Sequence, residues 1–311
     1  MKKTFLTFAL LLAVTALSAQ TLLKVSLQKG DKATYENVTS IGMTAPMGGG
    51  SQSVKVTNRT FVEVKDVTPD GYKVEFLTKD TKTEGNTELA YQVGDRLSRF
   101  VDNVPLLFQT DVNGGLQKLL NYEEVVGKMT RAALAEIDST YKKNPDMEKV
   151  SPKAKMIMAL NDLFSEKSVT DNFKEKSLFN LYGKTLKTGD KEDKEIQGIK
   201  SIVSYEVSNI LGMLTVVSQS KANMGEKDVK AFLIGNMKKM GMGEEVTSQI
   251  ENNWEQMKAM GMTDIDFNGT DTYHFLKNGW LNDQTGKGKM KMMGMNMEME
   301  STSKLIEHSW K

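Results

Sequence analysis

The sequence predicts an α+β protein in which a curved antiparallel β-sheet, or two related sheets, packs against central helices. Apolar and polar residues alternate over residues 21–110, again from about Ile199, and once more through the C-terminal part of the chain. Two blocks between these regions carry apolar residues at helical spacing instead. The predicted order is therefore strands, helices, strands, helices, strands.

The first 19 residues have the layout of a secretory signal peptide. Lys2 and Lys3 are followed by an apolar run from Phe5 to Leu17, and Ser18-Ala19 closes it with small residues. The run is shorter than the ~20 residues that span a bilayer. We expect cleavage after Ala19, a mature chain of residues 20–311, and a periplasmic or secreted protein of a Gram-negative envelope.

The composition limits the classes of function. The chain of 311 residues has 41 basic and 40 acidic side chains and no cysteine. Balanced charge gives no electrostatic basis for binding nucleic acid. Without cysteine there is no disulfide, no thiolate nucleophile and no lipid-anchored N-terminal cysteine. No second long apolar segment follows the leader, so we expect no transmembrane anchor after its cleavage.

The first β region begins with Leu23, Val25 and Leu27, which alternate with polar neighbours. Thr68-Pro69-Asp70-Gly71 is a strong turn sequence, and the alternating residues after it complete a hairpin. In the middle of the chain, Asn121 is a candidate N-cap for a helix over 122–141, and Ser151-Pro152 predicts the start of another. Residues 184–193 are predicted to form a charged connector.

The second half repeats this order. Strands are expected over 202–207 and 213–217, and helices over 226–240 and 244–260, with Gly241 and Gly261 suited to C-caps. Turns are expected at Asn278-Gly279 and Thr285-Gly286. We expect one secreted domain over 20–311, in which 20–185 and 195–311 form weakly related halves.

Methionine is the most unusual feature, with 21 residues in the chain. Met295, Met297 and Met299 alternate, so a strand places them on one face. Three interpretations stay open: these thioethers fill the core, form a deformable apolar wall for a ligand, or bind Cu(I) as soft ligands. Met237 and Met240 lie three residues apart in one predicted helix, as do Met257 and Met260 in the next, so each pair also shares a face.

Asp264, Asp266 and Asn268 match the opening of a calcium loop, with oxygen ligands at alternate positions before Gly269. The twelfth position is Phe275 rather than a bidentate glutamate, so an EF-hand is not expected. A looser calcium site and a plain Asp/Asn/Gly turn are the two interpretations.

No catalytic motif is present in the sequence. The nucleophile elbow, the HExxH zinc motif, the phosphate-binding loop and the dinucleotide fingerprint are all missing. Carboxylates are numerous but lie among lysines, as in 187–194, where a solvated surface is the usual interpretation. The sequence therefore predicts a non-enzymatic protein with no cofactor.

Several phrases resemble a family of secreted Gram-negative envelope proteins classed only as a domain of unknown function. They are the leader end Ser18-Ala19-Gln20, the segments 27–35 and 64–76, Asp111 to Gly114, Gly189-Asp190 and the meander 279–288. The resemblance implies an envelope origin and assigns no catalytic residue. The halves are also similar to lipoprotein-carrier-like folds, in which an antiparallel sheet wraps helices around an apolar cavity.

The leading hypothesis is binding of a hydrophobic ligand, such as a lipid or a lipoprotein segment, in a cavity lined by Met and Leu. The candidate ligand-binding residues are Met237, Met240, Met257, Met260, Met295, Met297 and Met299. The alternatives are a structural or protein-interaction component of the envelope and, third, the handling of Cu(I).

Overall fold

A computed structural model describes residues 20–44, 50–86, 100–196, 198–239, 244–292 and 294–310. The predicted signal peptide, residues 1–19, and two of the candidate residues, Met240 and Gly241, lie outside these ranges. Within them, no helix is long and apolar enough to cross a membrane.

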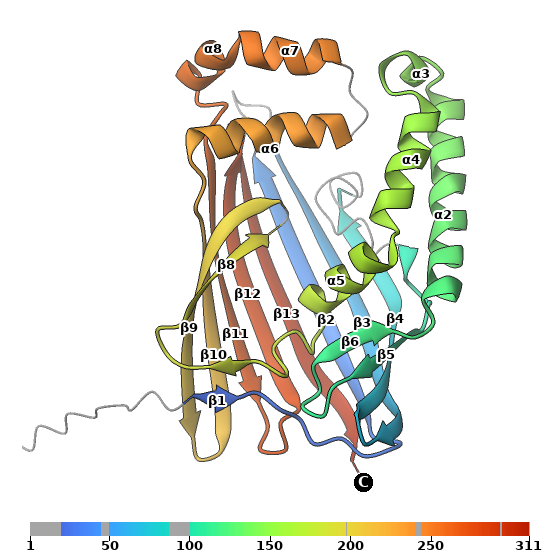
Figure 1. Ribbon diagram of the computed structural model, residues 1–311, viewed down its shortest axis with the longest axis vertical. Helices are drawn as coiled ribbons and strands as arrows, with labels where there is room; N and C mark the ends of the chain where they lie inside the picture. Colours follow the sequence, from blue (N-terminus) through green and yellow to red (C-terminus); the bar gives the residue numbers. More distant parts are fainter. Residues whose placement is uncertain are drawn as a thin grey trace, which may run out of the picture.

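One open sheet of 11 strands dominates the fold (Figure 1). Its order is β6-β5-β4-β3-β2-β13-β12-β11-β10-β9-β8, and all neighbours are antiparallel. The strands are β2 (Lys32–Thr44), β3 (Ser51–Thr68), β4 (Gly71–Gly85), β5 (Leu106–Thr110), β6 (Leu116–Leu119), β8 (Lys191–Ile196), β9 (Ile199–Ile210), β10 (Met213–Ala222), β11 (Ile265–Phe275), β12 (Leu281–Met292) and β13 (Met295–Ser309). Pairing of β2 with β13 joins the two halves of the chain in one sheet.

The helices lie at one side and one end of the sheet, so the predicted central position is not confirmed (Figure 1). The first group is α2 (Tyr122–Lys143), α3 (Met147–Val150), α4 (Lys153–Leu163) and α5 (Glu166–Lys176). The second is α6 (Glu226–Lys239), α7 (Glu244–Asn252) and α8 (Trp254–Ala259). The predicted helix 244–260 is therefore interrupted at Asn253, whereas Gly261, with φ +68°, ends α8 as expected.

The largest core cluster lies between α2–α5 and one face of the sheet, which we call the inner face. Tyr35, Val62, Phe76, Tyr205 and Phe275 belong to it. Several of its aromatic rings meet edge to face, which is a favourable geometry for ring pairs. A second cluster holds α6, α7 and α8 together around Trp254 and reaches the sheet at Ile265.

The N-terminal segment behaves differently from the prediction. Strand β1 is only Thr21–Leu22 and pairs with β7 (Thr185–Leu186). Leu23, Val25 and Leu27 are buried as their alternation predicts. Their segment does not join the large sheet. The Leu23 amide donates to Lys184 O and the Val25 amide to Asn113 O. The segment is therefore an extended loop whose apolar side chains pack in the core.

The predicted turn at Thr285-Gly286 is wrong, because β12 continues to Met292. Thr285 pairs with Thr272 on one side and with Thr302 on the other, so backbone pairing satisfies this stretch as a strand. The predicted turn at Asn278-Gly279 is present, with Gly279 at φ +88°. Asn121 does not cap α2 through its side chain. It instead accepts from the Leu107 amide and donates to Pro105 O.

Candidate functional site

The methionines of the last hairpin gather on the inner face. Register pairs Met290 with Met297 and Met292 with Met295, and it places Met43 of β2 opposite Met297. Because alternate residues of a strand point the same way, Met299 lies on this face as well. We call this set the methionine patch: Met43, Met290, Met292, Met295, Met297 and Met299.

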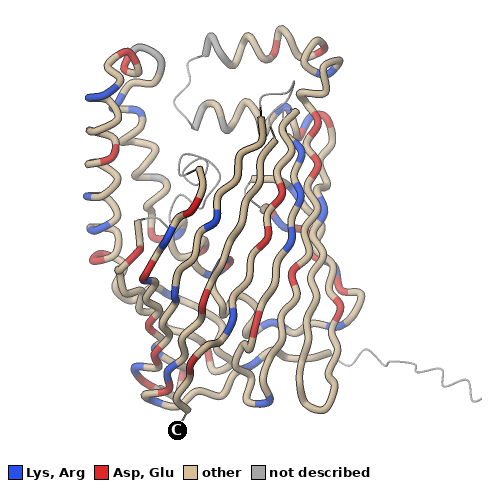
Figure 2. Tube along the Cα trace, turned by 180° about the vertical axis from the view of Figure 1, so that it is seen from behind, with Lys and Arg blue, Asp and Glu red and all other residues tan. Residues whose placement is uncertain are grey.

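Charged residues on the opposite face are paired across the strands in this same register. Lys289 pairs with Glu298 at 2.7 Å, and Lys287 with Glu300 at 3.2 Å. Figure 2 shows charged residues recurring along the strands seen from behind. A slip by one residue would move every methionine outward and every charge inward, which is strongly unfavourable.

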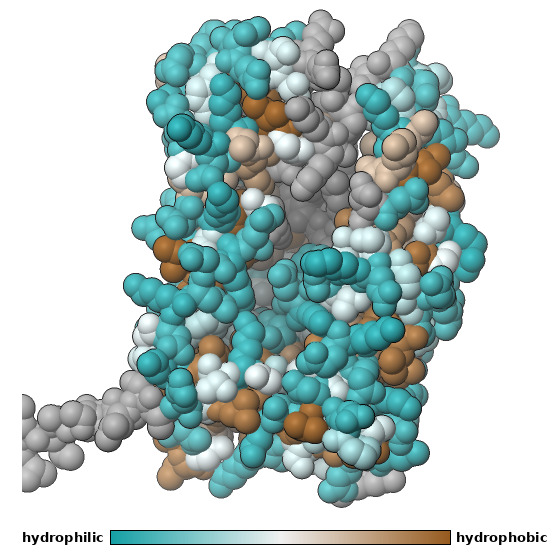
Figure 3. Space-filling view, in the orientation of Figure 1, coloured by the Kyte–Doolittle hydropathy of each residue, from teal (hydrophilic) through white to brown (hydrophobic). Residues whose placement is uncertain are grey.

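The patch is only partly used as core. Met43 and Met297 pack on the small buried cluster of Ile41 and Val54. The other four methionines belong to none of the three core clusters found in the described ranges. Met299 keeps 37% of its surface exposed. The patch is therefore a partly exposed apolar surface. Hydrophilic residues cover most of the described surface on the side shown in Figure 3, with hydrophobic residues scattered among them.

The predicted helical methionines are brought to this end of the sheet only in part. Met237 and Met257 pack in the Trp254 cluster, which touches Ile265, the residue paired with Met292. Met260 is half exposed at the C-terminus of α8 and does not belong to that cluster. The shared face predicted for Met257 and Met260 is therefore not formed, because the helix ends at Ala259.

A polar cluster lies farther along the inner face, and sequence reasoning missed it. Tyr205 of β9 donates to Glu192 of β8, and Glu192 also pairs with Lys194 at 2.7 Å and Lys184 at 3.3 Å. Glu192 and Lys194 belong to the charged run interpreted from sequence as solvated surface. Each is about one-third exposed, because β8 turns every second residue inward over Tyr205.

Asp271 of β11 lies on the same face beside this cluster. Burial raises the pKa of its carboxyl above the ordinary value, against the opposing effects of a hydrogen bond with Gln284 and the charge of Lys194. The pKa of the Lys184 ammonium is lowered, first by burial and then by the charge of Lys194. We call Lys184, Glu192, Lys194, Tyr205 and Asp271 the polar cluster.

Two residues beside the polar cluster have special surroundings: Asn180 has a buried oxygen that no described residue satisfies, and Gly286 lies where a side chain would not fit. The Asn180 amide donates to the Tyr273 hydroxyl at 3.3 Å, while its buried Oδ1 has no hydrogen-bond partner among the described residues. A Cβ on Gly286 would lie 2.6 Å from Asp271 Oδ1 and 2.5 Å from Ser301 Oγ. Glycine is thus required for the carboxylate to lie across β12.

The polar cluster and the methionine patch are neighbours on one surface. Gly286, beside Asp271, is four residues from Met290 along β12, a separation of about 13 Å at the usual rise of a strand. Ser301 and Gln284 lie on the same face of these strands. The inner face therefore offers an apolar surface with a charged, hydrogen-bonding group at one end.

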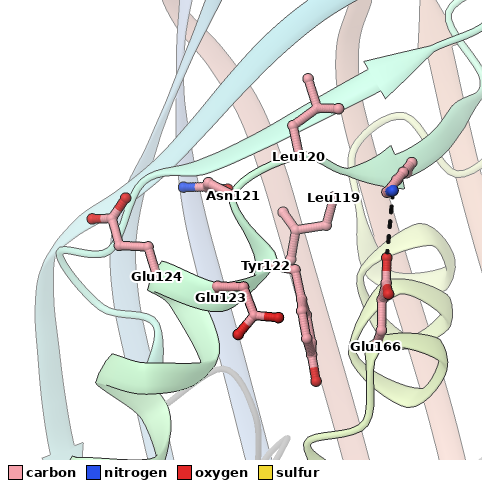
Figure 4. A pocket seen from close by; sticks show the side chains of 8 residues that line it. Leu119, Leu120, Asn121, Tyr122, Glu123, Glu124 and Glu166 are labelled. Carbon is pink, nitrogen blue, oxygen red and sulfur yellow. Dashed lines mark ion pairs between the residues drawn. The ribbon is translucent and has the colours of Figure 1, made fainter.

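A separate pocket of about 390 Å³ lies where β6 meets α2 and α5 (Figure 4). Three glutamates, Glu123, Glu124 and Glu166, line it, and Glu166 pairs with Lys118 at 3.9 Å. Leu119, Leu120 and Tyr122 also line it, but the three carboxylates do not fit the predicted apolar ligand.

The candidate calcium residues lie at the start of β11 rather than in a turn. Asp266 and Asn268 are in the strand and hydrogen-bond each other at 3.2 Å, and Asp264 pairs with Lys291 at 3.3 Å. The predicted Asp/Asn/Gly turn is therefore wrong. Across the described residues, no group of three or more His, Cys, Asp or Glu side chains is arranged to hold a metal ion.

No protein-family model matches the chain, and no curated protein matches its sequence. Among solved structures, the chain is similar to one described as showing lipid–protein interactions in lipovitellin, with 9% identity and a TM-score of 0.42. That match covers 92% of this chain but only 26% of the lipovitellin chain. A second match, to DynF of the dynemicin biosynthesis pathway of Micromonospora chersina, has 6% identity and a TM-score of 0.20. It covers 93% of this chain and 86% of that one.

Proposed function

We propose that this protein binds an amphipathic molecule, such as a lipid, against the inner face of its sheet, without catalysing a reaction. The observation that carries the proposal is the methionine patch. Across the described part of the chain, four of its six thioether side chains lie outside the core clusters, on a face whose other apolar residues are largely buried.

Methionine suits such a surface. Its unbranched, polarisable side chain adapts to irregular apolar shapes, so it recurs at surfaces that accept variable ligands. Apolar area of this kind is costly to leave in water, and an apolar ligand removes that cost. The apolar part of the ligand would lie on Met290 and Met299.

The polar cluster defines the other end of the ligand. Lys184 and Lys194 present ammonium groups, and Asn180 Oδ1 is an acceptor that no described residue satisfies. Buried polar atoms are normally paired, so a polar head group here would satisfy Asn180 Oδ1. The ligand would then span the distance from the polar cluster to Met290.

The proposed setting is the envelope of a Gram-negative cell. The basis for this is the layout of residues 1–19, with Lys2, Lys3 and the apolar run to Leu17. A binding protein in such a compartment would shield an apolar molecule from water.

The test is the affinity for a fluorescent 16-carbon fatty acid, measured by titration. Met290→Gln with Met299→Gln makes the patch polar without touching a core cluster. We expect binding at least about tenfold weaker, because two side chains then offer the acyl chain a polar surface in place of an apolar one. The control, Met158→Gln, changes an exposed methionine of α4 and should bind as the wild type does.

A leucine variant separates this role from Cu(I) handling. Met295, Met297 and Met299 changed together to Leu keep an apolar wall of similar volume but remove the soft thioether ligands. Retained fatty-acid binding supports the proposal. Equal affinity of the wild type and of the Met290→Gln, Met299→Gln variant for the fatty acid would contradict it.

A further inference from the structure

The β9–β10 hairpin ends in an exposed apolar tip at the far end of the sheet from the methionine patch (Figure 1). Ile210 is 66% exposed, Leu211 84% and Met213 55%. Ile210 and Met213 are a cross-strand pair, so their side chains lie on one face, and Leu211 projects beyond them. Single exposed apolar residues are ordinary, but three at one turn form a patch that water does not favour.

The turn keeps its leucine at a conformational cost. The two-residue loop Leu211-Gly212 has φ +55° and φ +84°, the pattern of a type I′ turn. Asn or Asp is preferred at the first of these positions, and a leucine with positive φ is strained. Leu211 is exposed, so packing of its side chain does not offset this strain. Backbone strain of this kind is an observation from which a function can be inferred.

The tip can leave water without burying an unpaired polar group. Residues 207–220 contain no charged side chain, and the tip in Figure 2 carries none. The Gly212 amide donates to Asn209 Oδ1 at 3.1 Å, and Met213 pairs with Ile210 across the turn. Dehydrating this turn therefore leaves few hydrogen bonds unmade.

One lysine lies on the tip, and two more belong to segments near it. A Cβ on Gly212 would lie 3.3 Å from Lys277 Cε, so the Lys277 stem lies on the turn itself. Lys24 touches the neighbouring Gly279 turn through its backbone. Lys187 precedes Thr188, whose hydroxyl bonds with Val207. In the part of the chain that the structure describes, none of these three ammonium groups forms an ion pair.

The carboxylates of the neighbouring segments lie outside the turn itself. Glu206 is in β9, four residues before Ile210, and Asp190 accepts a hydrogen bond from the backbone amide of Lys187 at 2.9 Å. An apolar tip with Lys24, Lys187 and Lys277 in or next to it fits a bilayer with anionic lipids. Apolar side chains enter the acyl region of such a bilayer, and lysines meet its head groups.

We propose that the tip formed by Ile210, Leu211 and Met213 inserts into the surface of a lipid bilayer, with Lys24, Lys187 and Lys277 on anionic head groups. A protein partner fits less well, because a stable interface needs about 20 residues a side and this turn offers three. The proposal does not depend on the ligand proposed for the methionine patch.

Leu211→Asn is the sharpest test, because Asn is the residue that a type I′ turn prefers. The variant should fold at least as stably as the wild type while removing the apolar tip. We expect the wild type to float with vesicles of phosphatidylcholine and phosphatidylglycerol in equal amounts, and the variant to partition about tenfold less. Met158→Gln, at an exposed methionine of α4, should float as the wild type does.

A second measurement locates the contact. The chain has no cysteine, so Met213→Cys can carry a single environment-sensitive fluorophore. Its emission should shift to the blue on adding the vesicles, and that of a label at Met158→Cys should not. The Met290→Gln, Met299→Gln variant should bind vesicles normally, which separates this proposal from the ligand site. No flotation of the wild type, or equal flotation of Leu211→Asn, would overturn the proposal.

Discussion

At the scale of single residues, Asp271 is the clearest difference between the inner face and an apolar core, because it places a carboxylate there. Its carboxyl is partly buried near Tyr205, Tyr273, Lys194 and Gln284, and burial raises its pKa. A raised pKa in the folded state means that the native protein holds this proton more tightly than the unfolded chain does. The contribution of Asp271 to stability is then largest in acid and falls as the pH rises through the folded-state pKa.

Asp271→Asn should remove this dependence. Relative to the wild type, the variant should gain free energy of unfolding as the pH rises from about 4, the ordinary carboxyl range, to 7. Urea unfolding at both pH values measures the difference. Asp266→Asn, on the exposed face of the same strand, is the control and should show no such gain. If the two variants respond to pH alike, the burial of Asp271 does not govern the effect.

Single residues also show why the polar cluster could not be predicted. Glu192 and Lys194 lie in a run of alternating charges, whose sequence is typical of a solvated surface. They reach Tyr205 only because β8 pairs with β9 in one register. No local pattern encodes that pairing. The methionine patch, in contrast, follows from the alternation of residues 295–299, which fixes one face in any strand.

At the level of elements, β12 carries one glycine next to the polar cluster and another next to the methionine patch. Gly286 and Gly288 lie two residues apart on the same strand and face. A Cβ on Gly286 would collide with Asp271 and Ser301, whereas one on Gly288 finds its nearest neighbour, Asn268 O, at 3.8 Å. Gly286 and Gly288 are therefore suited to a paired comparison, in which an added methyl group is crowded at the first position and not at the second.

Gly286→Ala should lower the free energy of unfolding by about 1–3 kcal/mol, the usual range for overpacking. Gly288→Ala should be neutral within about 0.5 kcal/mol or slightly stabilising, because alanine restricts the unfolded chain. Chemical denaturation of both variants checks this. Equal destabilisation would mean that strand propensity, rather than the position of Asp271, decides the cost.

The elements themselves were predicted with uneven success. The helix over 122–141, the start of α4 after Pro152 and the Gly261 cap follow from local signals and are confirmed. The turn at Thr285-Gly286 is wrong because its glycine serves close packing rather than reversal of the chain. Glycine alone does not distinguish these two uses.

At the scale of the whole molecule, one sheet joins strands from both ends of the chain. Tyr35 of β2 donates to Leu281 O of β12 at 2.8 Å across a separation of 246 residues. Sequence periodicity identifies strands but not their partners, so one sheet and two related sheets were equally consistent with it. The single sheet is what sets the methionine patch and the polar cluster on one continuous face.

This arrangement gives the two ends of the sheet different proposed roles. The methionine patch and α6–α8 lie at one end, and the apolar tip of the β9–β10 hairpin lies at the other (Figure 1). In the proposed scheme, the tip meets a bilayer while the inner face holds an amphipathic molecule. Each role has its own variants, so each can fail without the other.

The most direct test of ligand binding is native mass spectrometry of the mature protein isolated from its own cells, followed by organic extraction and lipid analysis. We predict a chain beginning at Gln20 with one apolar adduct per protein, and disappearance of that adduct in the Met290→Gln, Met299→Gln variant. A bare protein mass that stays bare after incubation with lipids of the same cells would contradict the proposed function.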